Sequence, residues 1–324
     1  MMTPMSQRTP MPGMAPSFLD KVCEVEVQTD VRYARAGVDH DRESGTSRRQ
    51  RDLKLDVYRP RVDDDSLRPA LILAFGGAFH RGSKSGEVFD GQAVATTVAE
   101  YCREFARRGY VCFSIDYRLM PEAPDPGVTR FLPADLAYNT DRIDQVRAIL
   151  GLPPCTPRMI ADTLEAATDD MCSAVTFVRS RCQQWSVDLS RIAIGGFSSG
   201  AATALNAALA EHVAVAAVVA LSGRVTQPVL EAFARGCRAG QPAPALLAFY
   251  GENDLPELRS FRVTLAEQLA AAGVDHQVAV VPGATHFYPR TAAAQLAGQP
   301  AGDVETVMAA FLHSRLRLAQ IGRQ

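Results

Sequence analysis

Residues 192–201 read Ile-Ala-Ile-Gly-Gly-Phe-Ser-Ser-Gly-Ala, and the interpretation of the whole chain starts from this stretch. An apolar run that predicts a buried strand ends in a Gly-x-Ser-x-Gly pattern, and small residues that favour a helix follow at once. Such a turn is so tight that it needs glycines on both sides, and it lifts the serine hydroxyl above the sheet. The amide N–H groups at the start of the following helix point at the same place. The pattern therefore predicts that Ser198 is a nucleophile.

Short apolar runs alternate with longer amphipathic segments along the rest of the chain. Strands are predicted at residues 22–31, 53–58, 70–75, 110–116, 191–195, 213–221, 245–250 and 276–281. Helices are predicted at residues 94–108, 161–184, 199–211, 257–272 and 303–318. This order indicates an α/β fold with a mostly parallel sheet flanked by helices, the first two strands forming an antiparallel edge. We expect one domain over residues 19–324, preceded by a disordered leader at residues 1–18.

One segment does not follow this alternation. Residues 119–158 contain several prolines, and a connection of about forty residues is uncommon in a compact domain unless it is a lid or a binding element. We expect this segment to be a lid insertion that arches over the C-terminal ends of the strands. The alternative is a surface excursion with no role in binding.

A serine hydroxyl needs a base, and the chain has six histidines. His286 alone follows the C-terminal end of a late predicted strand, in the sequence Val-Pro-Gly-Ala-Thr-His-Phe at 281–287. Open α/β sheets place their sites at that end of the strands. The sequence therefore predicts that His286 is the base.

The imidazole in turn needs an acid that holds its tautomer. Another predicted strand ends in Gly-Glu-Asn-Asp at 251–254, and Asp254 is the predicted acid. Glu252 and Glu257 are nearby alternatives, and Asp254 would otherwise only cap the next helix. The chain order of serine, aspartate and histidine is the one expected for this kind of fold.

A hydrolytic site also has to stabilise an oxyanion. After the first central strand the chain reads Phe-Gly-Gly-Ala-Phe-His-Arg-Gly-Ser at 75–83. Small residues allow backbone N–H groups to approach a substrate oxygen closely. We expect this loop to supply such donors.

Taken together, these stretches resemble the α/β-hydrolase superfamily, and most closely carboxylesterases of the hormone-sensitive-lipase-like kind. The resemblance covers residues 53–318 and also rests on Asp-Tyr-Arg-Leu-Met-Pro-Glu-Ala-Pro at 116–124. It implies that Gly77, Ala78 and Ser199 donate to the oxyanion through their backbone N–H groups. It further implies that Asp116 and Arg118 are structural supports.

The chain departs from the family pattern in its loop and around its acid. Phe75 stands where the family usually has histidine, and Ala78 stands where it has a last glycine. The Tyr-Gly-Glu-Asn-Asp stretch lacks the usual Asp-Pro-Leu character. None of these changes removes a catalytic group, because the oxyanion donors are backbone amides.

The predicted function is hydrolysis of a small carboxylic ester through an acyl-enzyme. An amidase or formamidase, an acyltransferase, and a binding protein on the same scaffold remain alternatives. The chain lacks HExxH, paired CxxC and dinucleotide motifs, so no metal or cofactor is expected. A net charge of −2 and the absence of long apolar runs predict neither nucleic acid nor a membrane as partner.

Cysteine usage predicts the compartment. The seven cysteines are odd in number and lack metal-site spacing, which favours reduced thiols and a cytoplasmic location. The C-terminal helix could pair with a copy of itself, so a homodimer is left open.

Overall fold

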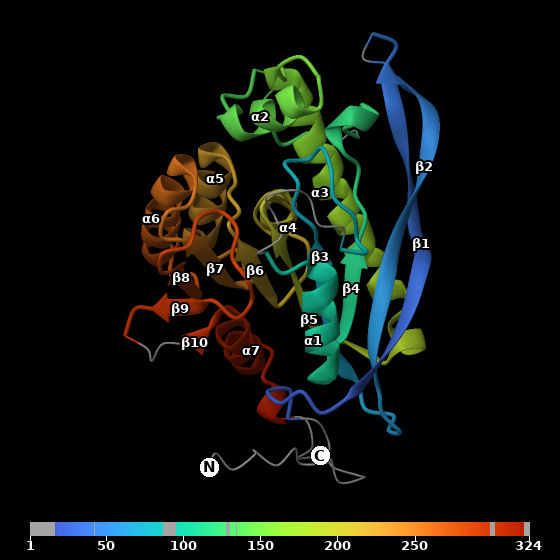
Figure 1. Ribbon diagram of the computed structural model, residues 1–324, viewed down its shortest axis with the longest axis vertical. Helices are drawn as coiled ribbons and strands as arrows, with labels where there is room; N and C mark the ends of the chain where they lie inside the picture. The colour runs from blue at the N-terminus through green and yellow to red at the C-terminus, as the bar shows by residue number, and fades with distance from the viewer. Residues whose placement is uncertain are drawn as a thin grey trace, which may run out of the picture.

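A mixed sheet runs through the molecule and carries its helices on both faces (Figure 1). The computed structural model describes residues 17–41, 43–86, 95–127, 130–133, 135–298 and 302–320. Within these residues the sheet has ten strands in the order β1-β2-β4-β3-β5-β6-β7-β8-β9-β10. The strands are β1 (Glu24–Asp41), β2 (Thr46–Arg61), β3 (Arg68–Ala74), β4 (Val111–Ile115), β5 (Val187–Phe197), β6 (Ala217–Leu221), β7 (Ala245–Gly251), β8 (His276–Val281), β9 (Ala293–Leu296) and β10 (Gly302–Asp303).

The six central strands β3 to β8 run parallel, and the strands at both ends pair antiparallel. Parallel strands need crossovers, and these are right-handed. The chain steps from β3 outward to β4 and later from β5 through β6 and β7 to β8. Since these steps run in opposite directions across the sheet, their helices fall on opposite faces.

Two helices cover one face of the sheet and four cover the other (Figure 1). The first pair is α1 (Val98–Arg107) and α7 (Val304–Arg315), and the opposite layer is α3 (Pro157–Ser180), α4 (Ser199–Leu209), α5 (Gln227–Arg238) and α6 (Pro256–Ala271). A further helix, α2 (Asp141–Ile149), lies above the C-terminal ends of the strands. Short 3₁₀ turns are η1 (Met120–Glu122), η2 (Cys182–Trp185) and η3 (Leu318–Gln320). No helix in the described ranges is long and apolar enough to cross a bilayer.

The prediction of an α/β fold with a mostly parallel sheet and flanking helices is confirmed, although several element bounds differ. The helix predicted at 161–184 begins earlier, at Pro157, because the Thr156 side chain caps it and proline suits a first helical turn. The strand predicted at 213–221 begins only at Ala217, since residues 211–215 form the connection out of α4. Helices α2 and α5 and strands β9 and β10 were not predicted.

The predicted leader, residues 1–18, lies outside the described residues except for its last two. Of these, Phe18 is only 2% exposed, and its ring packs edge-on against Tyr110 at 5.8 Å. Phe18 therefore packs against the body, and the division into a leader and one domain stays a prediction.

A buried carboxylate joins the first described segment to the last helix. Glu305, at the start of α7, lies 2.6 Å from the Lys21 ammonium and 2.5 Å from the guanidinium groups of both Arg108 and Arg290. Its side chain is 3% exposed, so three cations from distant parts of the sequence share one desolvated anion. This cluster fixes the lower end of the molecule.

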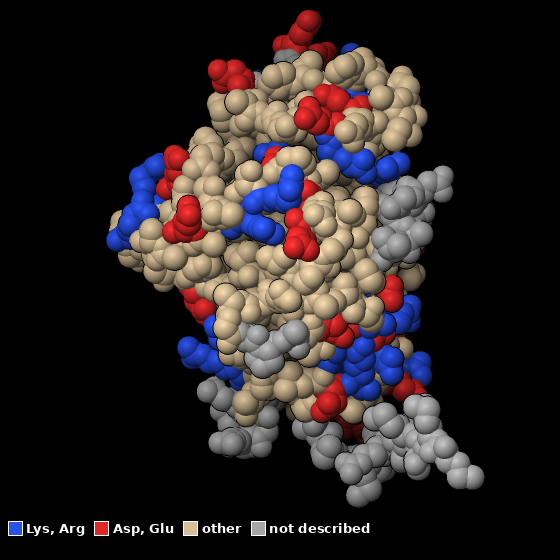
Figure 2. All heavy atoms as spheres, turned by 60° about the vertical axis from the view of Figure 1, so that its left-hand side comes forward, with Lys and Arg blue, Asp and Glu red and all other residues tan. Residues whose placement is uncertain are grey.

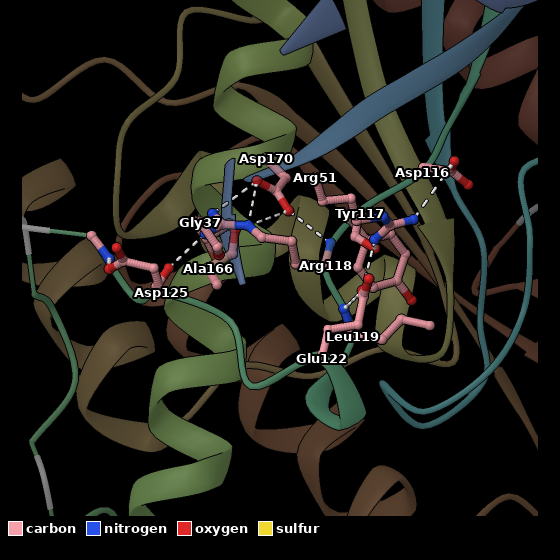
Figure 3. A network of polar contacts seen from close by, with 12 residues as sticks. Gly37, Arg51, Asp116, Tyr117, Arg118, Leu119, Glu122, Asp125, Ala166 and Asp170 are labelled. Carbon is pink, nitrogen blue, oxygen red and sulfur yellow. Dashed lines mark hydrogen bonds and ion pairs between the residues drawn. The ribbon is translucent and has the colours of Figure 1, made fainter. Parts of the chain in front are cut away.

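A buried arginine joins three other elements (Figure 3). The guanidinium of Arg118 lies 2.8 Å from a carboxylate oxygen of Asp170 in α3 and donates to the carbonyl oxygens of Gly37, Asp125 and Ala166. Its backbone N–H donates to Asp170 as well, at 2.7 Å. Arg118 therefore holds β1, the segment after β4 and α3 together, in keeping with the supporting role that the resemblance implies.

Asp116 lies beside this network. Burial raises the pKa of its carboxyl, and Arg51 lies 3.7 Å away. The same Arg51 donates to Glu122 at 2.7 Å and to the carbonyl of Tyr117 at 2.9 Å (Figure 3). Asp116 thus belongs to the framework that orients Tyr117.

Candidate active site

Ser198 occupies a sharp turn between β5 and α4. Its backbone has φ 51° and ψ −114°. Residues other than glycine rarely adopt this conformation, and they keep it only where the surroundings enforce it. A Cβ on Gly196 would lie 2.4 Å from the carbonyl oxygen of Ala74, and one on Gly200 would lie 2.1 Å from the same oxygen. Only glycine fits at both places, which explains the Gly-x-Ser-x-Gly pattern structurally.

Ser198, His286 and Asp254 form one hydrogen-bonded chain. His286 Nε2 lies 2.9 Å from Ser198 Oγ, and His286 Nδ1 lies 2.7 Å from Asp254 Oδ1. Because a carboxylate only accepts, Nδ1 carries the proton, and Nε2 is left as the acceptor that faces the serine hydroxyl. His286 is 6% exposed and Asp254 is 3% exposed, so water competes little for these bonds.

The surroundings of Asp254 hold its side chain in one orientation. Its Oδ2 accepts from the Ser222 hydroxyl at 2.6 Å and from the Gly251 N–H at 3.2 Å, while Oδ1 accepts from the Leu255 N–H at 2.8 Å. Ser222, which lies just past the end of β6, was not among the predicted site residues. The sequence offered little to find it, because one serine after a strand is common.

The two alternative acids lie elsewhere. Glu252 is exposed and accepts from the N–H of Gly283 at 2.7 Å. Glu257 lies in the first turn of α6, and His286 makes its carboxylate contact with Asp254 instead.

The loop after β3 adopts an unusual backbone. Gly77, Ala78 and Phe79 have φ values of 145°, 54° and 60° in succession. A Cβ on Gly77 would lie 1.9 Å from the carbonyl oxygen of Arg81, so this position needs glycine. Three consecutive residues with positive φ turn the loop back sharply toward Ser198.

The predicted oxyanion donors do not all reach the wall of the site. Ala78 and Ser199 line the hollow beside Ser198, whereas Gly77 does not. Phe79, which sequence analysis did not select, lines it too.

Tyr117 supports this loop from below. Its hydroxyl donates to the Phe75 carbonyl at 2.8 Å and lies 3.1 Å from Ser199 Oγ. The rings of Phe75 and Tyr117 are stacked with centroids 4.5 Å apart. Burial raises the pKa of Tyr117, which keeps the phenol protonated and able to donate. The framework around Arg118 therefore extends to the loop through Tyr117.

His80 connects the loop to α2. Its Nδ1 lies 2.7 Å from the carbonyl oxygen of Ala78, and its Nε2 lies 3.1 Å from the guanidinium of Arg147. Burial lowers the pKa of His80, which favours a neutral ring that donates from Nδ1 and accepts at Nε2. The contact between His80 and Arg147 thus fixes α2 to the loop after β3.

The hollow above Ser198 has an empty volume of about 470 Å³ and opens to solvent. Part of its wall comes from the segment predicted to be a lid. The lining residues from that segment are Tyr138, Asn139, Arg142 and Ile143. Arg224, Leu255 and Glu257 line the same hollow from the loops after β6 and β7 and from α6. Residues of the range 138–143 therefore form part of the wall above Ser198, and the role of the whole segment as a lid stays a prediction.

No group of three or more histidine, cysteine, aspartate or glutamate side chains in the described ranges is arranged to hold a metal ion.

Two family models match parts of the sequence. Residues 161–297 match the Phospholipase/Carboxylesterase family, and residues 55–138 match the BD-FAE family. The first match includes Ser198, Asp254 and His286, and the second includes the loop after β3. A search among curated proteins finds no match of significant similarity.

Solved structures share the fold over nearly the whole chain. Esterase 2 of Thermogutta terrifontis with propionate bound superposes with a TM-score of 0.53 at 19% identity, over 93% of this chain and 94% of that one. The same esterase phosphorylated by paraoxon gives 0.51 at 20% identity, over 91% and 92%. A fungal esterase from Rhizomucor miehei gives 0.54 at 17% identity, over 92% and 86%. At this level of identity the likeness concerns the fold.

Proposed function

We propose that this chain, a member of the α/β-hydrolase superfamily by its fold, is a serine carboxylesterase that hydrolyses small esters through an acyl-enzyme. One observation carries the proposal. Ser198, His286 and Asp254 come from the ends of three different strands and meet with hydrogen bonds of 2.9 Å and 2.7 Å. A base within reach of a serine hydroxyl, itself oriented by a buried acid, is the arrangement that activates such a nucleophile.

The proposed reaction has two halves. Ser198 Oγ attacks the ester carbonyl carbon while His286 Nε2 takes its proton, and the tetrahedral intermediate collapses as His286 returns that proton to the leaving alcohol. A water molecule then loses a proton to His286 and attacks the acyl-enzyme. The acid product leaves as His286 gives the proton back to Ser198. In both halves Asp254 accepts a hydrogen bond from the Nδ1–H group of His286 and stabilises the imidazolium.

The oxyanion would be held by backbone N–H groups. We assign this role to Ala78 and Ser199, which line the hollow, and the role of Gly77, which does not line it, stays a prediction from the resemblance. Ser199 is the first residue of α4, so its N–H is not used within the helix and the positive end of the helix dipole adds to it. The supports under the loop, from Tyr117 and His80, fit a site whose donors have to be fixed before the substrate arrives.

The similar structures support the same reading. Each of them is described as an esterase, and one of them, from Thermogutta terrifontis, is phosphorylated by paraoxon. For this chain we expect paraoxon to transfer one diethylphosphoryl group to Ser198. Intact-mass spectrometry should detect that adduct on the wild type, and Ser198→Ala should remain unmodified.

The direct test is hydrolysis of p-nitrophenyl esters of increasing acyl length. Ser198→Ala should lower kcat by about 10⁴-fold or more, whereas Ser260→Ala, the same change at an exposed site on α6, should leave it unchanged. Asp254→Asn should cost about 10⁴-fold because it disturbs the tautomer, and Glu252→Gln should cost little. Full turnover in Ser198→Ala would refute the assignment of the nucleophile.

Matched ester and anilide substrates separate an esterase from an amidase. Product analysis with added alcohols separates hydrolysis from acyl transfer. We expect the ester to be preferred and water to be the acceptor.

We also propose a reducing, cytoplasmic location. All seven cysteines of the chain fall within the described ranges and are free, which fits a compartment where thiols stay reduced. The lid role of residues 119–158 and a homodimer through the C-terminal helix stay predictions.

A further inference from the structure

Two arginines line the hollow above Ser198. Arg142 lies in the first turn of α2, and Arg224 lies in the loop after β6. Both are half-buried. On the side of the molecule shown in Figure 2, basic side chains gather below the topmost lobe, with acidic side chains beside them. A hydrolase for purely apolar esters has no need of two guanidinium groups in this position.

Neither of these arginines has a carboxylate partner in the part of the chain that the structure describes. This differs from arginines elsewhere in the chain, such as Arg118 with Asp170 or Arg130 with Asp162 at 2.7 Å. Half-buried cations are usually paired, because burial of an uncompensated charge is unfavourable.

The contacts that the two arginines do make leave donors free. Arg142 has only a long contact to Gln145, at 3.4 Å, and its guanidinium carbon lies 5.9 Å from the centre of the Phe287 ring. Arg224 stacks on the Tyr138 ring at 3.9 Å and donates from one nitrogen to the carbonyl of Asn139 at 3.0 Å. These contacts hold the Arg224 side chain in place, and they leave most N–H groups of both arginines available.

The local charge balance favours an anion. Burial lowers the pKa of Arg142, and the nearby positive charge of Arg81 lowers it further. Of the charged side chains that line the hollow, Arg142 and Arg224 are positive and Glu257 is negative, which leaves an excess of one positive charge. An anionic group on a bound substrate would relieve this excess.

We propose that Arg142 and Arg224 form a carboxylate-binding subsite, so that the preferred substrates are esters carrying a free carboxylate group. A guanidinium presents paired N–H donors that match the two oxygens of a carboxylate, which gives both affinity and orientation. The proposal rests on the proposed esterase function, since it assigns the part of the ester that does not react. Glu257, on the same wall, would reject a substrate whose carboxylate lies at the wrong end.

The test compares charged esters with neutral esters of the same shape. On the acyl side, 4-nitrophenyl hemiglutarate is paired with 4-nitrophenyl 5-methylhexanoate. On the alcohol side, 3-acetoxybenzoate is paired with 3-isopropylphenyl acetate. We expect the wild type to prefer the carboxylate in one of the two pairs by about tenfold or more in kcat/KM. The pair that shows the preference identifies the side on which the subsite lies.

Substitutions then assign the preference to the two residues. Arg142→Gln and Arg224→Gln should each lower the ratio of charged to neutral kcat/KM by about 10- to 100-fold, mainly through KM. Arg238→Gln makes the same change at an exposed site at the far end of α5 and should leave the ratio as it was. Because a loss of packing would affect both esters alike, the ratio separates recognition of charge from structural damage.

A measurement on the wild type needs no variant. Raising the salt concentration from about 0.05 M to about 0.5 M should lower kcat/KM for the charged ester and not for the neutral one. Equal kcat/KM values within both pairs, or a ratio that both variants leave unchanged, would overturn the carboxylate subsite while leaving the esterase intact. If the wild type hydrolyses neither ester of either pair, the proposed function itself fails.

Discussion

Replacing Asp170 by asparagine removes the negative charge that faces Arg118 and keeps the size of the side chain. The pair is well enclosed, with side chains that are 2% and 5% exposed (Figure 3). Asp170 accepts from the Arg118 backbone N–H at 2.7 Å and from its Nε at 3.0 Å, and a guanidinium nitrogen lies 2.8 Å away. The substitution therefore leaves a buried cation without its counter-ion.

The size of the effect follows from that burial. Removing one partner of a buried ion pair costs about 3–5 kcal/mol of unfolding free energy. We expect Asp170→Asn and Arg118→Met each to lose this much. The double substitution should cost less than the sum of the two by about 1–3 kcal/mol, because no lone charge remains.

Urea unfolding at constant temperature measures these free energies. The chain has one tryptophan, Trp185, which is 2% exposed, so its fluorescence follows loss of the core. Circular dichroism on the same samples checks that one transition is observed by both probes. Asp52→Asn is the surface control. Its partner Arg35 lies at 3.0 Å, but their side chains are 41% and 61% exposed, so its cost should stay within about 1 kcal/mol.

Additivity would refute this reasoning. If the cost of the double substitution equals the sum of the single costs within about 0.5 kcal/mol, then Arg118 and Asp170 do not stabilise one another. The buried network would then act through its separate hydrogen bonds to carbonyl groups, and the charge of the pair would contribute nothing to stability.

Two further predictions concern neighbours of this network. Burial raises the pKa of Asp169 from its ordinary value of 3.8 to about 6. Between these two values the native protein holds more protons than the unfolded chain, so stability falls as the pH rises through that window. Asp169→Asn should therefore stabilise the protein more at about pH 8 than at about pH 4.5 in urea unfolding, and an equal effect at both values would contradict the burial of this group. Tyr117→Phe leaves the Phe75 carbonyl without its donor and should cost about 1–3 kcal/mol and lower kcat. Tyr110→Phe, which removes a buried hydroxyl that has no partner in the described structure, should do neither, and equal losses in the two variants would argue against support of the loop.

The parts of the site that the sequence predicted are those determined by local pattern. Ser198, Asp254 and His286 each follow an apolar strand directly, and parallel strands bring their C-terminal ends to one edge. The positions of the strands and their order in the chain are enough to predict that these three side chains meet. The loop after β3 could also be predicted, because its small residues can be recognised in the sequence alone.

The residues that escaped prediction depend on contacts between distant segments. Ser222 matters because β6 lies between β5 and β7, which places its hydroxyl 2.6 Å from Asp254. Arg142 and Arg224 matter because the chain folds α2 back over the loop after β6. No spacing in the sequence links any of these pairs.

The missed helices have separate causes. Helix α5 did carry a signal, since Pro228 opens it and Val229, Leu230 and Phe233 form its buried side. Helix α2 is only nine residues long, and most of its residues are polar. Strand β1 extends well beyond its predicted end at residue 31 because it pairs with β2 as a long hairpin that rises past the rest of the sheet (Figure 1).

The shared carboxylate of Glu305 has a consequence for the order of events during synthesis. Lys21, Arg108 and Arg290 all leave the ribosome before Glu305 does, so each then lacks this shared anion. Lys21 and Arg290 have Glu104 and Glu100 as earlier partners, at 2.5 Å and 3.3 Å, whereas the ion pair of Arg108 forms only after α7 has emerged. Until then the nascent chain carries an excess of positive charge at the foot of the sheet, which keeps that surface hydrated and opposes premature association with other chains.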